Sequence, residues 1–447
     1  MGTTRDIAEF AYKTTFDDFD STLIKHVKNV LLSGVGMTLA GINTGAGKAV
    51  ISYVKECAAP QEAGVLGAGF RTSAEYAALT NGTTSHSTEL EDDIMPELIY
   101  SVGIFPGVFA LGEKLHVSGK EVIEASIIAW DIAAKLSLPV IRPLLRRGGV
   151  APSFCTIGVA AASAKLLKLG LKETTMAISI SASHTSQLIL GQTGSDSHLF
   201  EAGLAGRNGI ASAMLAKYDL TGQPDIFETP MGFLRGVAGE AYSVPKLGAP
   251  YRAMNIGIKK YPCCFLEMHI IDGFIELIKA HNISAYDVES IQVDVSPAFA
   301  NTVRYHHPKD EEEARFSLPH SIACCFLDKE LWIESYSTER VNHPQVIAFR
   351  DKVKMVVQPE GIDSESVGGR EVPISIRLKD GTEYRKVCPK YTDPLIVSDE
   401  EVMDKYMKCA SRVLSQSRAE HVAETVLSLD KVQDISELMT LLTFPDK

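Results

Sequence analysis

A concentration of acid–base side chains lies between positions 86 and 93. It contains one imidazole and four carboxylates: His86, Glu89, Glu91, Asp92 and Asp93. On a helix of 3.6 residues per turn, His86, Glu89 and Asp93 would share one face. On a buried face, like charges this close must be held by shared protons, cations or a ligand, which would make an acid–base site. On a solvated face, the same carboxylates would only favour the positive end of a helix dipole. Both interpretations are open at this point.

A second candidate site lies in the glycine-rich segment 203–209, which contains Arg207 and follows His198 by five residues. We expect this segment to open a helix, and a helix N-terminus beside an arginine and a histidine would bind a carboxylate. The alternative is close helix packing with a surface arginine.

Two pairs of adjacent cysteines occur, but neither has the CxxC spacing of a metal site. Cys263-Cys264 follows Lys259 and Lys260, and ammonium groups beside a thiol would favour the thiolate. A structural role for this pair is the alternative. The pair at 324–325 lies in an apolar helical pattern and is expected to be buried. His320 precedes the same helix, where a lone histidine is more often structural than catalytic.

Nucleotide-binding motifs are not supported. The cluster Gly41–Ala49 has the wrong glycine spacing for a phosphate loop, and Ala49 replaces the required hydroxyl. It is expected to be a turn. No GxGxxG follows a predicted strand, so a dinucleotide fold is not indicated either.

Composition narrows the class of protein. The chain has 447 residues, a formal charge of −12 and 45% hydrophobic residues, as expected for a globular protein with a large core. The acidic balance argues against nucleic-acid or anionic-membrane partners. No apolar signal segment or membrane span is predicted. We therefore expect a cytoplasmic protein, with no indication of mitochondrial import, whose eight cysteines are reduced.

The type of secondary structure predicted to position these side chains changes along the chain. Residues 5 to 250 show helical periodicity, with small residues at 158–164 that suit mutually buried helices. Alternation predicts a strand at 288–295 and a hairpin over 372–387, with a type I′ turn at Asp380-Gly381. Helical patterns return at 317–327 and 400–442. We predict a mainly α fold, with a helical domain from 1–264 and 396–447 and an inserted α+β lid domain from 265–395.

The order of these segments resembles the MmgE/PrpD family over nearly the whole chain. The resemblance rests on the following segments: Asn81-Gly82 with His86, Glu89 and Glu91-Asp92; Phe105-Pro106-Gly107; Gly203 with Ala205–Gly209; Thr221-Gly222 with Gly232-Phe233; Lys259–Cys263; and Phe316-Ser317 through Leu327-Asp328. It implies a homodimer that acts on small polycarboxylic acids without a cofactor or metal.

Several positions depart from the family pattern. Glu89 replaces an aspartate, Asp93 a common threonine, and His198 a lysine. The other departures are Phe105 and Ala151 in place of histidines, His320 in place of a tyrosine, and Cys264 in place of a histidine.

The chemistry implied by the resemblance is proton transfer next to a carboxylate. We expect catalytic roles for Glu89, His86, Asp93, His198 and His320, and substrate-binding roles for Asp92, Arg207, Lys259, Lys260 and Cys264. In this hypothesis Glu89 or His86 is the base or acid, and His198 and His320 are alternative proton donors. The favoured function is a dehydratase or decarboxylase of a citrate- or alkylcitrate-like acid. The alternatives are an isomerase or epimerase of a dicarboxylic acid, or a family member that binds without catalysis.

Overall fold

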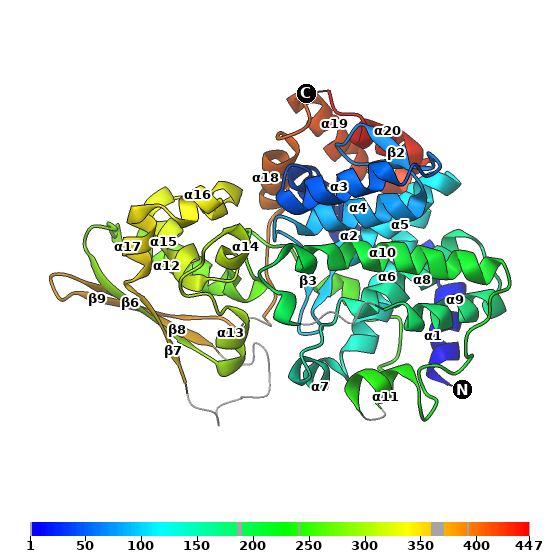
Figure 1. The fold of residues 1–447 in the computed structure, drawn as a ribbon, viewed down its shortest axis with the longest axis horizontal. Coiled ribbons are helices and arrows are strands. Elements are labelled where there is room, and N and C mark those ends of the chain that lie inside the picture. The colour runs from blue at the N-terminus through cyan, green and yellow to red at the C-terminus, as the bar shows by residue number, and fades with distance from the viewer. Residues whose placement is uncertain (1, 186–189, 240–241, 359–370, 391–392, 447) are drawn as a thin grey trace. The chain divides into compact units, whose positions relative to one another are not determined.

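A computed structural model describes residues 2–185, 190–239, 242–358, 371–390 and 393–446 (Figure 1). The chain divides into two compact units. Unit 1 comprises residues 1–191, 196–258 and 396–447, and unit 2 comprises residues 192–195 and 259–395. The mainly α prediction is confirmed. The role of unit 2 as a lid stays a prediction.

Unit 1 is built from helices contributed by both ends of the chain. Its helices are α1 (Thr3–Lys13), α2 (Ser21–Gly41), α3 (Gly45–Glu56), α4 (Ala74–His86), α5 (Phe105–Leu115), α6 (Gly119–Ser137), α7 (Ile141–Arg146), α8 (Ser153–Leu166), α9 (Leu171–Ser183), α10 (Asp196–Lys217), α11 (Phe233–Ala238), α18 (Asp399–Ala410), α19 (Gln416–Leu427) and α20 (Ile435–Thr443). Side-chain caps fix several helix starts: Ser73 accepts from the backbone N–H of Tyr76 at the start of α4, and Ser118 forms a capping box with Glu121 at the start of α6.

Helices α4 and α10 pack so closely that only glycine fits between them. A Cβ at Gly82 would lie 2.7 Å from the Cα of Gly203, and a Cβ at Gly203 would lie 2.1 Å from the carbonyl oxygen of Leu79. The segment from Gly203 therefore lies inside α10, and the prediction that it opens a helix is wrong. Its small residues serve helix packing, which was the alternative.

Short strands interrupt the helices of unit 1, and helical periodicity did not predict them. β1 (Ala63–Val65) pairs with β2 (Phe70–Thr72). β3 (Asp93–Ile94) pairs antiparallel with both β4 (Ile99–Tyr100) and β5 (Ile256–Gly257). The β3 pairings bring residues more than 150 positions apart in sequence side by side and fix the backbone at Asp93.

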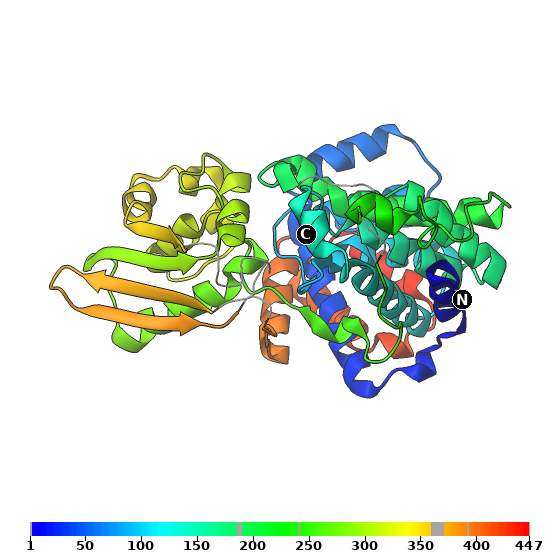
Figure 2. The same ribbon diagram turned by 90° about the horizontal axis from the view of Figure 1, so that it is seen from below.

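Unit 2 combines a four-stranded sheet with helices. The sheet order is β7-β6-β8-β9, from β6 (Val288–Val295), β7 (Val353–Val357), β8 (Val372–Leu378) and β9 (Glu383–Cys388). The helices are α12 (Met268–His281), α13 (Pro297–Thr302), α14 (Glu311–Ala314), α15 (Leu318–Asp328), α16 (Thr338–Val341) and α17 (Pro344–Arg350). Figure 2 shows β8 and β9 as an orange hairpin beside β6.

The hairpin lies where the sequence predicts it, but its turn is not of the predicted type I′. Gly381 has φ +89°, whereas Asp380 is not in the left-handed region. The N–H of Gly381 bonds to the carbonyl of Leu378, and the N–H of Leu378 bonds to the carbonyl of Thr382. A type I′ turn would need positive φ at both central residues, so the predicted turn type is wrong. The connection is a three-residue loop that ends in a left-handed glycine.

Among the described residues, no single helix is long and apolar enough to cross a bilayer. Helices α2 and α3, which meet at a bend, are long and apolar enough only when they are taken together. All eight cysteines lie in the described ranges, and none forms a disulfide there.

Candidate acid–base site

The acidic segment begins where α4 ends. The helix stops at His86, Ser87 caps it, and Glu89 has a left-handed φ of 55°. The Ser87 hydroxyl bonds to the carbonyl of Thr84 (2.8 Å) and contacts that of Gly41 (3.2 Å), the last residue of α2. Such local bonds from serine compete with helix continuation. The predicted helical face containing His86, Glu89 and Asp93 is therefore wrong.

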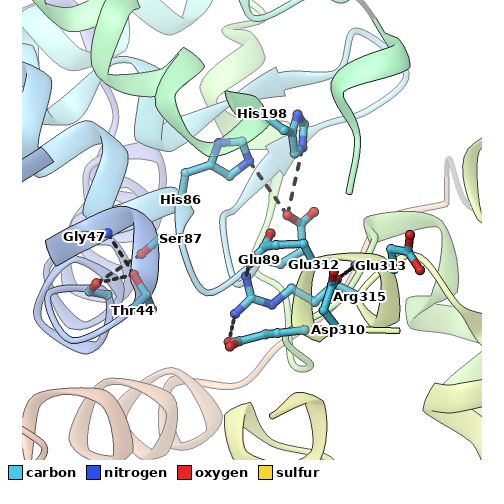
Figure 3. Close-up of polar contacts among 12 residues, drawn as sticks. Thr44, Gly47, His86, Ser87, Glu89, His198, Asp310, Glu312, Glu313 and Arg315 are labelled. Atoms are coloured by element: carbon cyan, nitrogen blue, oxygen red, sulfur yellow. Dashed lines mark hydrogen bonds and ion pairs between the residues drawn. The ribbon is translucent and has the colours of Figure 1, made fainter. Parts of the chain in front are cut away.

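The chain reversal after α4 nevertheless brings the first candidates together. The carboxylate oxygen Oε2 of Glu89 lies 4.0 Å from Nε2 of His86 and 4.0 Å from Nε2 of His198 in the first turn of α10. Figure 3 shows both imidazoles directed at this carboxylate. The two imidazole ring centres are 4.8 Å apart. The exposed fractions are 0% for His86, 3% for Glu89 and 5% for His198, so the solvated helix start is excluded.

Further acidic groups surround these three residues. Oε1 of Glu91 lies 3.8 Å from Nε2 of His86, and Oε1 of Glu201 lies 3.7 Å from Nδ1 of His198. Burial raises the pKa of Glu201 and the charge of Glu89 adds to this, while His198 opposes it. The pKa of the Tyr100 hydroxyl is also well above its ordinary value, first because of burial and then because of the nearby carboxylates. A site with excess buried negative charge is suited to holding protons or cations.

Asp92 and Asp93 lie in the loop and in strand β3 that follow Glu89. Lys405 of α18 places its ammonium 2.9 Å from Oδ1 of Asp92 and 2.8 Å from the carbonyl of Leu90. Asp93 pairs with Tyr100 across β3 and β4. No local pattern indicated Lys405, which is 313 positions from Asp92. Glu201 could have been found, because it lies three residues after His198 on the same helix face.

Arg207 lies elsewhere on α10. It is nine residues after His198, which is roughly 13 Å along a helix axis, and its Nε bonds to the Asn208 side chain at 3.1 Å. Its charge acts on Glu75, in the first turn of α4. Arg207 is therefore not part of the cluster around Glu89.

The remaining candidates belong to unit 2 and are described within it. Lys259 is 1% exposed, and Cys264 is also buried. Lys260 pairs with Asp272 at 3.2 Å. Burial raises the pKa of Cys263 well above its ordinary value, which favours the structural role of this pair over the thiolate.

His320 belongs to a buried polar network of unit 2. Its Nε2 lies 2.8 Å from the carbonyl oxygen of Ser335, so this nitrogen carries the proton and donates it. Nearby, the Ser321 hydroxyl donates to Glu267 at 2.6 Å and contacts the Tyr336 hydroxyl at 2.8 Å. Burial lowers the pKa of His320 to about 4. His320 is therefore neutral near pH 7, which fits an acceptor better than the proton donor expected from the sequence.

This pKa predicts a pH effect on stability. Because His320 binds its proton at about pH 4 when folded and near 6.5 when unfolded, the unfolded chain takes up more protons between these values. The free energy of unfolding should fall as pH falls from 6.5 towards 4, by up to about 3 kcal/mol from this group. In His320→Gln, which retains an N–H donor for Ser335, the fall should be smaller. Urea unfolding at pH 7, 5.5 and 4.5 measures the free energy of unfolding of both proteins. An equal fall of this free energy with pH in the two proteins would contradict the prediction.

Two departures from the family pattern are core residues. Phe105 is 1% exposed and packs edge-on against Phe109, with ring centres 5.6 Å apart. A Cβ at Gly34 of α2 would lie 2.6 Å from the Phe105 ring. Ala151 is fully buried. Both residues therefore belong to the apolar core.

The fold and the cluster define a mainly helical protein of two units, in which two imidazoles and several carboxylates are buried together at the ends of two packed helices. Comparison with known proteins gives the family. The MmgE/PrpD N-terminal domain matches residues 5–244, and the MmgE/PrpD C-terminal domain matches residues 261–431. The chain belongs to the MmgE/PrpD family.

Three of the similar proteins share one name. Cis-aconitate decarboxylase from Aspergillus terreus is 25% identical over 480 aligned residues, covering 100% of this chain and 97% of that protein. The Mus musculus protein of the same name is 26% identical, covering 95% of this chain and 90% of its own length. The Homo sapiens protein is 24% identical, with 95% and 91% covered.

Proposed function

We propose that this protein is a lyase that acts on a small citrate- or aconitate-like polycarboxylic acid by proton transfer next to a carboxylate. The observation that carries the proposal is the buried arrangement of Glu89 between His86 and His198, with 4.0 Å from its carboxylate to each imidazole. Family membership and the cis-aconitate decarboxylases among its relatives support the substrate class.

The cluster offers both halves of a proton transfer. In a decarboxylation, the C–C bond to a carboxylate breaks, CO2 leaves, and the electron pair left on the neighbouring carbon takes a proton. In a dehydration, a base takes the proton next to a carboxylate and an acid protonates the departing hydroxyl. A buried carboxylate beside imidazoles suits the base, and an imidazolium suits the acid. We assign the base to Glu89 and the acid to His198, whose imidazole is oriented by Glu201 at 3.7 Å.

Product analysis by NMR in D2O tests the proposal. The protein is incubated with citrate, an alkylcitrate, cis-aconitate and an amino-dicarboxylic acid in turn. We expect CO2 release with deuterium in the product, or a new alkene, from one of the first three. Deuterium uptake with inverted configuration would instead show an epimerase. Thermal stabilisation by a ligand without turnover would show a binding protein. Either result would overturn the proposal.

The homodimer implied by family resemblance remains part of the proposal. Sedimentation velocity of the full chain measures it directly, and a single monomer species at micromolar concentration would contradict it.

A further inference from the structure

Tyr100 supplies a third ring to the cluster around Glu89. It belongs to β4, and Asp93 lies directly opposite it in β3. The centre of its ring is 5.0 Å from that of His86 and 6.3 Å from that of His198, and the planes of the Tyr100 and His198 rings meet at 89°. The two imidazoles are themselves 4.8 Å apart. The phenol ring therefore packs against both imidazoles.

Tyr100 is more accessible than the three residues at the centre of the cluster. It is partly exposed, whereas His86, Glu89 and His198 are 0%, 3% and 5% exposed. Its backbone lies against buried structure, because the carbonyl of Tyr100 accepts a contact from the Cys155 thiol at 3.7 Å. The exposed part of the Tyr100 side chain is therefore available to a ligand next to the buried acid–base groups.

The phenol of Tyr100 is neutral near pH 7. Burial of most of the side chain raises its pKa well above the ordinary value, and four carboxylates add to this effect through their negative charge: Asp93, Glu201, Glu89 and Glu91. The hydroxyl therefore keeps its proton and remains a hydrogen-bond donor. Ionised carboxylates only accept hydrogen bonds, so the hydroxyl offers an anionic substrate a donor that the surrounding acidic groups do not.

Both forms of the proposed reaction build up negative charge that needs such a donor. The electron pair of the broken C–H or C–C bond is delocalised into a carboxylate that remains on the substrate, and the oxygens of that carboxylate gain charge. A donor placed at these oxygens stabilises the transition state more than the ground state, and removing one such donor typically costs about 10²–10³ in kcat. A tyrosine that stays protonated performs this role for an enolate in other enzymes.

We propose that Tyr100 is a further catalytic residue, whose hydroxyl donates a hydrogen bond to the substrate carboxylate that gains charge in the transition state. The phenol keeps its own proton throughout. In a dehydration Glu89 takes the proton from carbon and His198 protonates the departing hydroxyl, whereas in a decarboxylation His198 protonates the carbon that CO2 leaves. This role rests on the proposed lyase function.

Tyr100→Phe tests the role, because it removes the hydroxyl and keeps the ring that packs against the imidazoles. We expect kcat for the responsive polycarboxylic acid to fall about 10²–10³-fold. KM should change much less, because the hydrogen bond is strongest in the transition state. The matched control is Tyr218→Phe, since Tyr218 directly follows α10 and is 73% exposed. It should turn over like the wild type.

Binding of a nitronate analogue distinguishes this role from a structural one and needs no turnover. In the analogue an ionised nitro group replaces the carboxylate next to the reacting carbon, so its two oxygens carry the charge of the enediolate. Calorimetry should give a Kd that is higher by roughly tenfold or more for Tyr100→Phe than for the wild type, with a smaller difference for the parent acid.

The outcomes separate the two proposals. Full turnover or unchanged nitronate affinity in Tyr100→Phe would refute the role of Tyr100 and leave the lyase intact. Wild type that turns over none of the tested acids would refute the lyase, and the catalytic role of Tyr100 with it. If Tyr100→Phe lost its cooperative unfolding transition, 3-fluorotyrosine at position 100 would replace it. This residue keeps the ring and is a stronger donor, so it should bind the nitronate more tightly, and equal or weaker binding would overturn the proposal.

Discussion

Glu89→Gln should reduce kcat for the responsive polycarboxylic acid by about 10²–10⁴-fold, the usual contribution of a positioned acid or base. The amide has nearly the same shape as the carboxylate but cannot accept a proton at neutral pH. Glu89 is 3% exposed and sits between two imidazoles at 4.0 Å, so water cannot readily replace it as the base. Because the change removes proton transfer rather than substrate contacts, KM should change much less than kcat.

The matched control for this variant is Glu437→Gln. Glu437 is an exposed residue of α20 in the same unit, so the same loss of one charge should leave turnover unchanged. Steady-state kinetics on both variants, with thermal unfolding as a check on folding, provides the measurement. If Glu89→Gln and His198→Ala both retained full turnover, the assignment of this cluster to proton transfer would be wrong.

Periodicity predicted the fold class and most elements because those signals are local. The alternation at 288–295 corresponds to β6, and the two halves of the 372–387 pattern correspond to β8 and β9. The two-residue strands β3, β4 and β5 are too short to show a period. They exist because the segments before and after them bring residues 93–94 next to 99–100 and 256–257.

The site was predictable in composition but not in geometry. The sequence indicated that His86, Glu89 and His198 carry chemistry, yet it placed the first two on a continuing helix. The helix ends because Ser87 bonds back to carbonyls and Glu89 adopts a left-handed conformation. That departure turns the Glu89 carboxylate towards both imidazoles. The contact of Lys405 with Asp92 depends on the packing of a C-terminal helix, which no local pattern encodes.

The contact between α4 and α10 is what joins these residues, since His86 ends one helix and His198 lies in the first turn of the other. Gly203→Ala should therefore lower the free energy of unfolding of unit 1 by about 3 kcal/mol, the upper part of the usual cost of overpacking. The added methyl would lie 2.1 Å from the carbonyl oxygen of Leu79, a backbone atom that cannot rotate away. The helices must separate, and the two imidazoles should separate with them.

Tryptophan fluorescence can follow the unfolding of unit 1 alone. Trp130 is fully buried in α6 of unit 1, and Trp332 belongs to unit 2, so a Trp332→Phe background reports on unit 1. Urea titration in that background should give a lower midpoint for Gly203→Ala with an unchanged slope. Gly236→Ala in α11 is the control, because its added Cβ would meet no atom within 4 Å other than those of its chain neighbours and its own helix backbone. It should be neutral or stabilise by up to about 1 kcal/mol. Equal midpoints for Gly203→Ala and Gly236→Ala would show that the glycine contact does not set the spacing of the two helices, and the acid–base cluster would then need another explanation for its geometry.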